Sequence, residues 1–220
     1  MTALKRVIIA GASGLIGSHL LQLLLSEDDI DVVVALVRRP LPFSHSKIQQ
    51  ITISFEEIAS HKEMIRADAV FCCLGSTRKK TPDLNDYRRV DYFYPLELAK
   101  IAAENGVNQY HLVSALGSDV RSSNAYVRLK GEVEQDIKKL SIRSLHIYKP
   151  SLLVGKRSEK RPLEKLAIHL MNLLNPFLMG SLKKYRSIKA ETVARAMLNQ
   201  YKRNRNGVYS YPSDQIKALA

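Results

Sequence analysis

The sequence has few of the features that mark exported, membrane-spanning or metal-binding proteins. Only two of its 220 residues are cysteines, and these, Cys72 and Cys73, are adjacent. Neighbouring side chains on a strand face opposite ways, so we expect no disulfide between them, and a metal site would need further ligands. No apolar run approaches the roughly 20 residues of a membrane span. The first strand pattern begins almost at the N-terminus, leaving no room for a signal peptide, and we expect a reducing, cytoplasmic location.

Acidic residues are also scarce. There are 21 Asp and Glu against 34 Lys and Arg, which gives a net charge of +13 and a pI of about 9.8. This balance favours anionic partners. The basic residues are dispersed and form no aromatic-interleaved nucleic-acid motif, so we expect a small-molecule substrate, anionic or carbonyl-bearing, rather than nucleic acid. The oligomeric state stays open.

The length and the 45% hydrophobic content suit one domain. The regular pattern of strands and helices changes after Gly155. We therefore expect residues from about 156 to 220 to add a small lobe on the substrate side of that domain.

The dominant feature of the sequence is a strand–turn–helix pattern at its start. A β-branched run over residues 7–10 leads into three glycines spaced three apart, and an apolar helical pattern follows over residues 15–25. Glycine allows backbone angles that other residues avoid and lets a bound group approach closely. The N–H groups that begin the helix can then bind an anion, most usefully a pyrophosphate. The residues expected to bind a dinucleotide here are Gly11, Ser13, Gly14, Leu15, Ile16 and Gly17.

Strand and helix patterns alternate along most of the chain, which predicts a doubly wound, parallel α/β sheet with right-handed crossovers. In such a sheet ligands lie off the carboxyl ends of the strands, so we expect Leu74, Gly75, Ser76 and Thr77 to line the cofactor crevice. Pro95 is expected to kink or break its helix. Strands are expected over residues 7–10, 31–37, 48–55, 68–75, 110–114 and 144–150, and helices over 15–25, 55–66, 87–104, 125–140, 163–174 and 190–201.

Two arginines follow the second predicted strand and bear on the choice of cofactor. A carboxylate at this place would hold the ribose hydroxyls of NAD. The chain has Arg38 and Arg39 instead. A guanidinium pairs with a 2′-phosphate in bidentate fashion, so these residues favour NADP over NAD. The alternative is that both are solvent-facing charges at a strand end.

Tyr126 and Lys130 are four residues apart, so they share one face of the predicted helix over residues 125–140. A phenol is a poor acid or base at neutral pH, but a nearby ammonium favours the phenolate. The tyrosine can then exchange a proton with a substrate oxygen while hydride moves to or from a nicotinamide. Lys130 can also hold the cofactor ribose. Tyr185 and Lys189 have the same spacing, but they lie in the tail, so position favours Tyr126.

These motifs occur in one order: Gly11-x-x-Gly14-x-x-Gly17, the strand ending at Gly75, Ser114, Tyr126-x-x-x-Lys130 and Lys149-Pro150-Ser151. In this order the chain resembles the short-chain dehydrogenase/reductase superfamily, in its extended or atypical branch. Residues 71–78 and 130–134 are similar to segments of the Tat-interacting-protein-like oxidoreductases. The resemblance runs to about Leu198. It implies an NADP-binding Rossmann fold, reductase activity with Tyr126 and Lys130 as catalytic residues, and contacts from Pro150, Ser151 and Leu152 near the nicotinamide.

One position departs from the superfamily pattern. The catalytic hydroxyl usually sits just after the residue that matches Ser114, and that place is Ala115 here. Either Ser114 or Ser118 substitutes for it, with Ser114 the candidate catalytic residue, or the hydroxyl is missing. Two hypotheses follow: an NADP-dependent oxidoreductase acting on a carbonyl or alcohol, or a binding protein that senses a dinucleotide without turnover.

Overall fold

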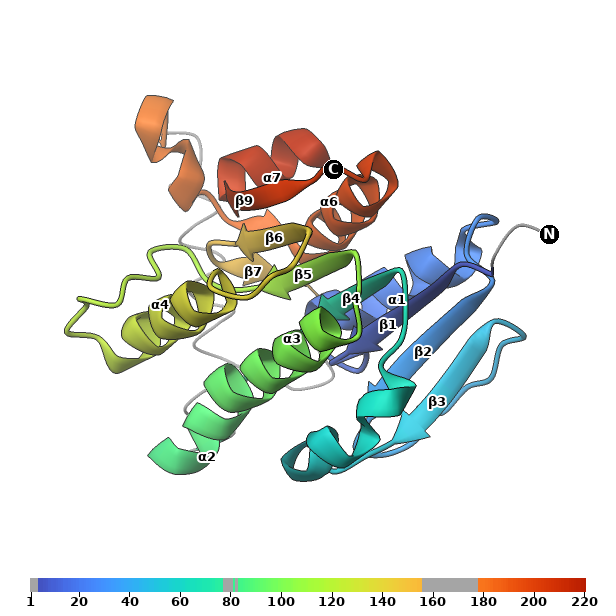
Figure 1. Ribbon diagram of the computed structural model, residues 1–220. Coiled ribbons are helices and arrows are strands. Elements are labelled where there is room, and N and C mark those ends of the chain that lie inside the picture. The colour runs from blue at the N-terminus through green and yellow to red at the C-terminus, as the bar shows by residue number, and fades with distance from the viewer. Residues whose placement is uncertain (1–3, 77–80, 82, 156–177) are drawn as a thin grey trace.

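A computed structural model describes residues 4–76, 81, 83–155 and 178–220. Within these residues, seven parallel strands form one twisted sheet in the order β3-β2-β1-β4-β5-β6-β9 (Figure 1). The strands are β1 (Arg6–Ala10), β2 (Val32–Val37), β3 (Ile48–Thr52), β4 (Ala69–Cys72), β5 (Gln109–Val113), β6 (Ser144–Lys149) and β9 (Gly207–Pro212).

Helices cover both faces of the sheet. One face packs against α1 (Leu15–Ser26), α6 (Ala190–Arg203) and α7 (Ser213–Leu219). The opposite face packs against the 3₁₀ helix η1 (Phe55–Met64), α3 (Tyr94–Glu104) and α4 (Ala125–Ile137). The helix α2 (Leu84–Arg88) and the π-helical turn η2 (Arg89–Phe93) lead into α3 (Figure 1).

Within the described residues, no helix combines the length and apolarity that crossing a membrane requires.

The strand sequences explain this double covering. In β1, Val7 and Ile9 join the core under α1 and α6, whereas Ile8 and Ala10 join the core under α3 and α4. All four are fully buried. A parallel sheet buried on both faces needs such a continuous apolar run rather than an alternating one. The predicted doubly wound α/β fold is therefore confirmed.

Some element bounds differ from the prediction. The helix expected over residues 87–104 is divided into α2, η2 and α3, and Pro95, in the first turn of α3, lies just after the π-helical turn η2, where the hydrogen-bond pattern of the helix changes. The strand expected to reach Phe55 ends at Thr52. The helix expected over residues 163–174 lies outside the described residues.

The C-terminal part of the chain completes the main sheet. The sequence predicts a small lobe over residues from about 156 to 220, but α6 packs against α1, and β9 pairs with β6 as the seventh strand. Residues 178–189 lie beside the end of β6 instead. There β7 (Leu153–Val154) pairs with β8 (Ile188–Lys189), and the 3₁₀ helix η4 (Gly180–Tyr185) precedes β8. This pairing brings a segment of the tail to the carboxyl ends of the strands.

Candidate active site

The glycine turn is packed too tightly for a side chain at two of its three glycines. Gly11 has φ +85°, and a Cβ there would lie 2.6 Å from the carbonyl oxygen of Cys73. A Cβ on Gly17 would lie 2.1 Å from the carbonyl oxygen of Gly11. Gly14 has more room: its N–H donates to the Gly11 carbonyl at 2.9 Å, and the nearest atom to an added Cβ lies at 3.1 Å. The first N–H groups of α1 have no partner within the helix, so this turn fits an anionic group.

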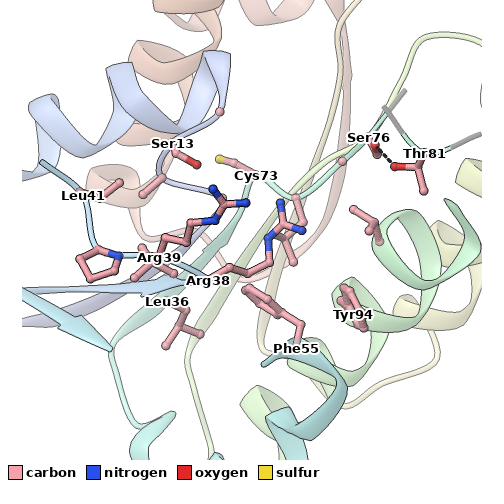
Figure 2. A pocket seen from close by; sticks show the side chains of 18 of the residues that line it. Ser13, Leu36, Arg38, Arg39, Leu41, Phe55, Cys73, Ser76, Thr81 and Tyr94 are labelled. Atoms are coloured by element: carbon pink, nitrogen blue, oxygen red, sulfur yellow. Dashed lines mark hydrogen bonds between the residues drawn. The ribbon is translucent and has the colours of Figure 1, made fainter. Parts of the chain in front are cut away.

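A cavity of about 630 Å³ lies beside this turn (Figure 2). Figure 2 shows the Arg38 and Arg39 guanidinium groups pointing into it from the end of β2. Both side chains are exposed, and neither pairs with a carboxylate among the described residues. Two such cations suit a phosphate. Of the predicted cofactor residues, this cavity is lined by Gly11, Ser13, Gly14, Arg38, Arg39, Leu74, Gly75 and Ser76.

Lys130, on α4, lies next to Gly75, which lines this cavity, and forms a buried ion pair there. Its Nζ lies 2.8 Å from Asp91 Oδ1, and the two side chains are 5% and 1% exposed. The other oxygen of Asp91 accepts the Ser76 N–H at 2.8 Å. Burial lowers the pKa of Lys130, but the Asp91 carboxylate and then Tyr126 outweigh it, so the pKa lies above its usual value. Lys130 therefore remains a cation close to Gly75, where an added Cβ would lie 3.8 Å from Nζ.

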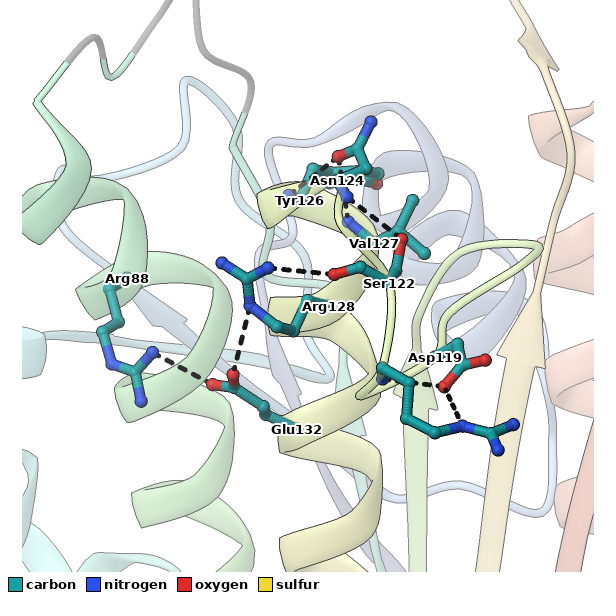
Figure 3. Close-up of polar contacts among 9 residues, drawn as sticks. Arg88, Asp119, Ser122, Asn124, Tyr126, Val127, Arg128 and Glu132 are labelled. Atoms are coloured by element: carbon teal, nitrogen blue, oxygen red, sulfur yellow. Dashed lines mark hydrogen bonds and ion pairs between the residues drawn. The ribbon is translucent and has the colours of Figure 1, made fainter.

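Tyr126 lines a second cavity, also of about 630 Å³. The Asn124 side chain caps α4 by accepting the N–H groups of Tyr126 at 3.0 Å and Val127 at 3.3 Å (Figure 3). This cap places Tyr126 in the first turn of the helix, with the side chain 37% exposed. Lys130 follows one turn later on the same helix face. Of the predicted site residues, the second cavity is lined by Ser114, Tyr126, Pro150, Ser151 and Leu152.

The hydroxyl of Ser114 is held by a buried carboxylate. Ser114 Oγ and Ser118 Oγ both donate to Glu134 Oε1, and Glu134 Oε2 pairs with Lys149 Nζ at 2.6 Å. A serine hydroxyl has one proton, so in this arrangement neither serine offers a donor to a substrate. The catalytic role of Ser114 stays a prediction, and in this arrangement its hydroxyl proton is directed to Glu134. Ala115 also lines the second cavity, with a methyl group where the superfamily has its hydroxyl.

The Pro150–Ser151–Leu152 segment lines the cavity but has most of its backbone bound within the protein. The Leu116 N–H donates to the Pro150 carbonyl at 2.9 Å, and the Ile188 N–H donates to the Leu152 carbonyl at 3.0 Å. The Ser151 N–H donates to Ser213 Oγ at 2.7 Å. These bonds join the segment to the tail and leave few of its backbone groups for a ligand.

Four predicted residues line neither cavity: Leu15, Ile16, Gly17 and Lys130. Ile16 is buried in the core under α1, and Gly17 is covered by Gly11. Leu15 lies against Gly155, where an added Cβ would be 2.8 Å from Leu15 Cδ1. Thr77 lies outside the described residues.

Three residues near the two cavities were not predicted. Asp91 and Glu134 are buried acids on helices, and a sequence pattern alone makes such residues look like solvent-facing charges. Glu134 did carry a signal, because it stands four residues after Lys130 on the same helix. The position of Tyr185 in the tail favours Tyr126 over it in the sequence, yet in the structure Tyr185 lines the second cavity with Tyr126.

A family described as NAD(P)H-binding matches residues 11–149 of the chain. The chain belongs to this family, within the short-chain dehydrogenase/reductase superfamily. Its fold is an NAD(P)-binding, oxidoreductase-type fold, and its cofactor is a nicotinamide dinucleotide. The tight backbone at Gly11 and the two cations beside the first cavity fit such a group.

The chain is similar to relatives named HTATIP2 and FMP52. It is 34% identical to the protein HTATIP2 of Rattus norvegicus over 199 residues, which cover 89% of this chain and 80% of the relative. It is 32% identical to protein FMP52, mitochondrial, of Candida albicans, covering 70% of each chain. It is 27% identical to the protein of the same name in Emericella nidulans, covering 97% and 94%.

The names of the fungal relatives contradict the expectation of a purely cytoplasmic location, since several are called mitochondrial. Cys72 and Cys73 are both free thiols. Free thiols argue only against oxidising compartments, and they do not select one among the others. The inference from cysteine content to cytoplasm was therefore too narrow.

Solved structures of low identity share the fold. The Bordetella bronchiseptica enzyme WbmH, solved with NAD⁺, superposes with a TM-score of 0.69 at 18% identity and covers 98% of this chain and 78% of its own. MoeE5, solved with UDP-glucose and NAD, gives a TM-score of 0.68 at 18% identity and covers 94% and 76%.

Proposed function

We propose that the chain is an NADP-dependent oxidoreductase that interconverts a carbonyl compound and an alcohol. The observation that carries this proposal is the arrangement of Tyr126 and Lys130 on α4. The Tyr126 phenol lines the second cavity, and the buried Lys130 cation follows one helical turn later. A positioned phenol with an ammonium nearby can transfer a proton to a substrate oxygen.

The protein residues have separate roles in this proposal. When bound, the cofactor supplies or accepts the hydride. In the direction of reduction, the carbonyl carbon takes that hydride and the carbonyl oxygen takes a proton from Tyr126, so an alcohol and the oxidised cofactor result. The Tyr126 phenolate then recovers a proton from solvent. Lys130 stabilises the phenolate, and Asp91 keeps the Lys130 ammonium in place.

The choice of NADP rests on Arg38 and Arg39. Both point into the first cavity, beside the glycine turn (Figure 2). None of the described residues that line this cavity is an aspartate or a glutamate. A carboxylate there would hold ribose hydroxyls, whereas two guanidinium groups favour a 2′-phosphate.

A second candidate function is the sensing of a dinucleotide without turnover. The observation that favours it is the loss of the catalytic hydroxyl: Ala115 has none, and Ser114 and Ser118 both donate to Glu134. The intact Tyr126 and Lys130 favour the enzyme.

The two candidates differ in whether NADPH is consumed. The experiment follows NADPH absorbance with a panel of aldehydes, ketones and sugar nucleotides, after calorimetry has established that NADPH binds. Consumption that depends on one class of compound supports the enzyme. NADPH binding without consumption across the panel supports the sensor.

A further inference from the structure

The second cavity differs from the first in the chemistry of its walls. Eleven described residues line it, and none carries a charge. Ser114 and Ser151 donate their hydroxyl protons to Glu134 and to the Arg186 carbonyl. The remaining walls are the apolar residues Ala115, Leu116, Pro150, Leu152, Leu153 and Leu178, together with Gly117 and the rings of Tyr126 and Tyr185.

Among the described lining side chains, the phenols of Tyr126 and Tyr185 are the polar groups that these walls leave to a ligand. No hydrogen bond joins either phenol oxygen to another described residue, and the side chains are 37% and 47% exposed. Two described cations lie near this cavity without lining it: Lys149 pairs with Glu134, and the Lys184 ammonium lies 5.2 Å from the centre of the Tyr185 ring. A ligand here would therefore meet hydroxyl groups and apolar surface, but no cation among the described lining residues.

The tail supplies one wall of this cavity. Leu178 precedes η4 and Tyr185 is its last residue, and the pairing of β7 with β8 holds this segment beside Leu153. Arg186 Nε donates to the Leu178 carbonyl at 2.7 Å, which fixes the position of the Leu178 backbone. The apolar wall is thus built from two distant parts of the chain that are joined by specific bonds.

These walls do not suit a nucleotide sugar, the type of ligand with which MoeE5 was solved. The diphosphate of such a ligand is costly to bury unless cations or N–H donors pair with it. The chain also covers only 76% of MoeE5. The anion-binding groups lie at the first cavity, with Arg38 and Arg39, and the cofactor would occupy them.

We propose that the second cavity binds an uncharged carbonyl compound with an apolar body, of the medium-chain aldehyde or ketone class. The proposal rests on the oxidoreductase function above and names its substrate class. The carbonyl oxygen lies at Tyr126, and the chain lies against Leu152, Leu153 and Leu178. A volume of about 630 Å³ falls within the usual range of small-molecule sites and leaves room for both a nicotinamide ring and such a chain.

The test measures binding of unreactive carbonyl analogues to the NADPH-loaded protein by calorimetry. The probes are butanamide, hexanamide, octanamide and decanamide, with octanoate as the charged counterpart of octanamide and UDP-glucose as the competing class. We expect Kd to fall by about 2- to 4-fold for each added methylene until the cavity is filled. Octanoate should bind at least about 10-fold more weakly than octanamide, because its charge would be buried without a partner. Affinity independent of chain length, or tighter binding of octanoate or UDP-glucose, would overturn the proposal.

A pair of variants places the binding in this cavity. Leu178→Glu introduces a charge into the apolar wall and should weaken octanamide binding by about 10-fold or more, with NADPH affinity unchanged. Leu182→Glu is the matched control: Leu182 belongs to the same tail segment and is 48% exposed, but it does not line the cavity. Equal effects of the two variants would contradict the assignment. If Leu178→Glu fails to fold by circular dichroism, the chain-length series on the native protein decides.

Failure of the proposed function gives a different result. If the amides bind with the expected chain-length dependence but octanal does not consume NADPH, the apolar cavity is supported and the oxidoreductase proposal fails. If another compound of the panel, but not octanal, consumes NADPH and the amides show no chain-length dependence, the enzyme is supported and the substrate class is wrong.

Discussion

Asp91 and Lys130 form an ion pair with an Nζ–Oδ1 distance of 2.8 Å, and both side chains are almost completely buried. The pair joins η2 to α4, and through the Ser76 N–H it also holds the loop that follows β4. The position of Lys130 and the position of the loop that follows β4 therefore both depend on the Asp91 carboxylate.

The first prediction concerns this carboxylate. Asp91→Ala leaves the Lys130 ammonium buried without its partner, and we expect the free energy of unfolding to fall by about 3–5 kcal/mol in urea denaturation. Asp86→Ala is the control, because the Asp86–Arg89 ion pair, at 3.1 Å, is more than half exposed. That variant should lose less than about 1 kcal/mol. Similar losses in the two variants would show that the Asp91–Lys130 pair contributes little.

The second prediction concerns the choice of cofactor. Replacing Arg38 and Arg39 by alanine removes both guanidinium groups from the first cavity, so NADPH affinity should fall by about 10-fold or more while NADH affinity changes little. Arg195→Ala, an exposed arginine on α6, should alter neither affinity. Calorimetry on the native protein gives the first check: equal affinities for NADPH and NADH would contradict the role of the two arginines.

The third prediction separates two roles of the glycine turn: binding the pyrophosphate, and packing closely against neighbouring backbone. Gly14 has the roomier position, so Gly14→Val should keep the fold and lose NADPH binding, because the branched side chain occupies the place of the pyrophosphate. A Cβ at Gly17 would lie 2.1 Å from backbone, so Gly17→Ala should instead lower Tm strongly. Circular dichroism and calorimetry measure the two effects. Normal NADPH binding by a folded Gly14→Val protein would exclude this turn as the phosphate site.

The fourth prediction uses two buried histidines on β5 and β6. The His111 and His146 rings stack with centroids 4.6 Å apart, and both are fully buried. Burial lowers the pKa of His111 well below its usual range and lowers the pKa of His146 to about 4. An unfolded histidine titrates near pH 6.5, so the neutral pair stabilises the fold above that pH, and this stability is lost as the pH falls towards the folded pKa values.

For His146 alone, the loss between about pH 7.5 and about pH 5 should reach about 2 kcal/mol in the free energy of unfolding. His146→Gln should show a correspondingly shallower decline than the native protein. Parallel profiles for the native and His146→Gln proteins would contradict this account.

The sequence was informative wherever local pattern decides structure. The apolar run of β1, the three glycines and the Tyr126–Lys130 spacing predicted the first βα unit, the fold class and two residues that the structure places close together. The predicted bounds of α1, β5 and β6 are close to those in the structure. These features depend on residues near one another in the chain.

The features that escaped prediction depend on distant contacts. β9 was missed because Gly207–Pro212 is a largely exposed edge strand whose pairing with β6 closes the sheet. Tyr185 reaches the second cavity only through the pairing of β7 with β8. To predict that the Ser114 hydroxyl donates to Glu134, one must know that Glu134, twenty residues later, faces it from α4.

The most direct test of the oxidoreductase proposal is the single-turnover rate of NADPH oxidation by the Tyr126→Phe protein with the best substrate of the panel. Phenylalanine keeps the ring but removes the exchangeable proton, so the rate should fall by about 100-fold or more while NADPH affinity changes little. Tyr209→Phe, at a tyrosine on β9 that lines neither cavity, should stay within a few-fold of the native rate. A Tyr126→Phe rate within a few-fold of native would contradict the role of Tyr126 as the proton donor.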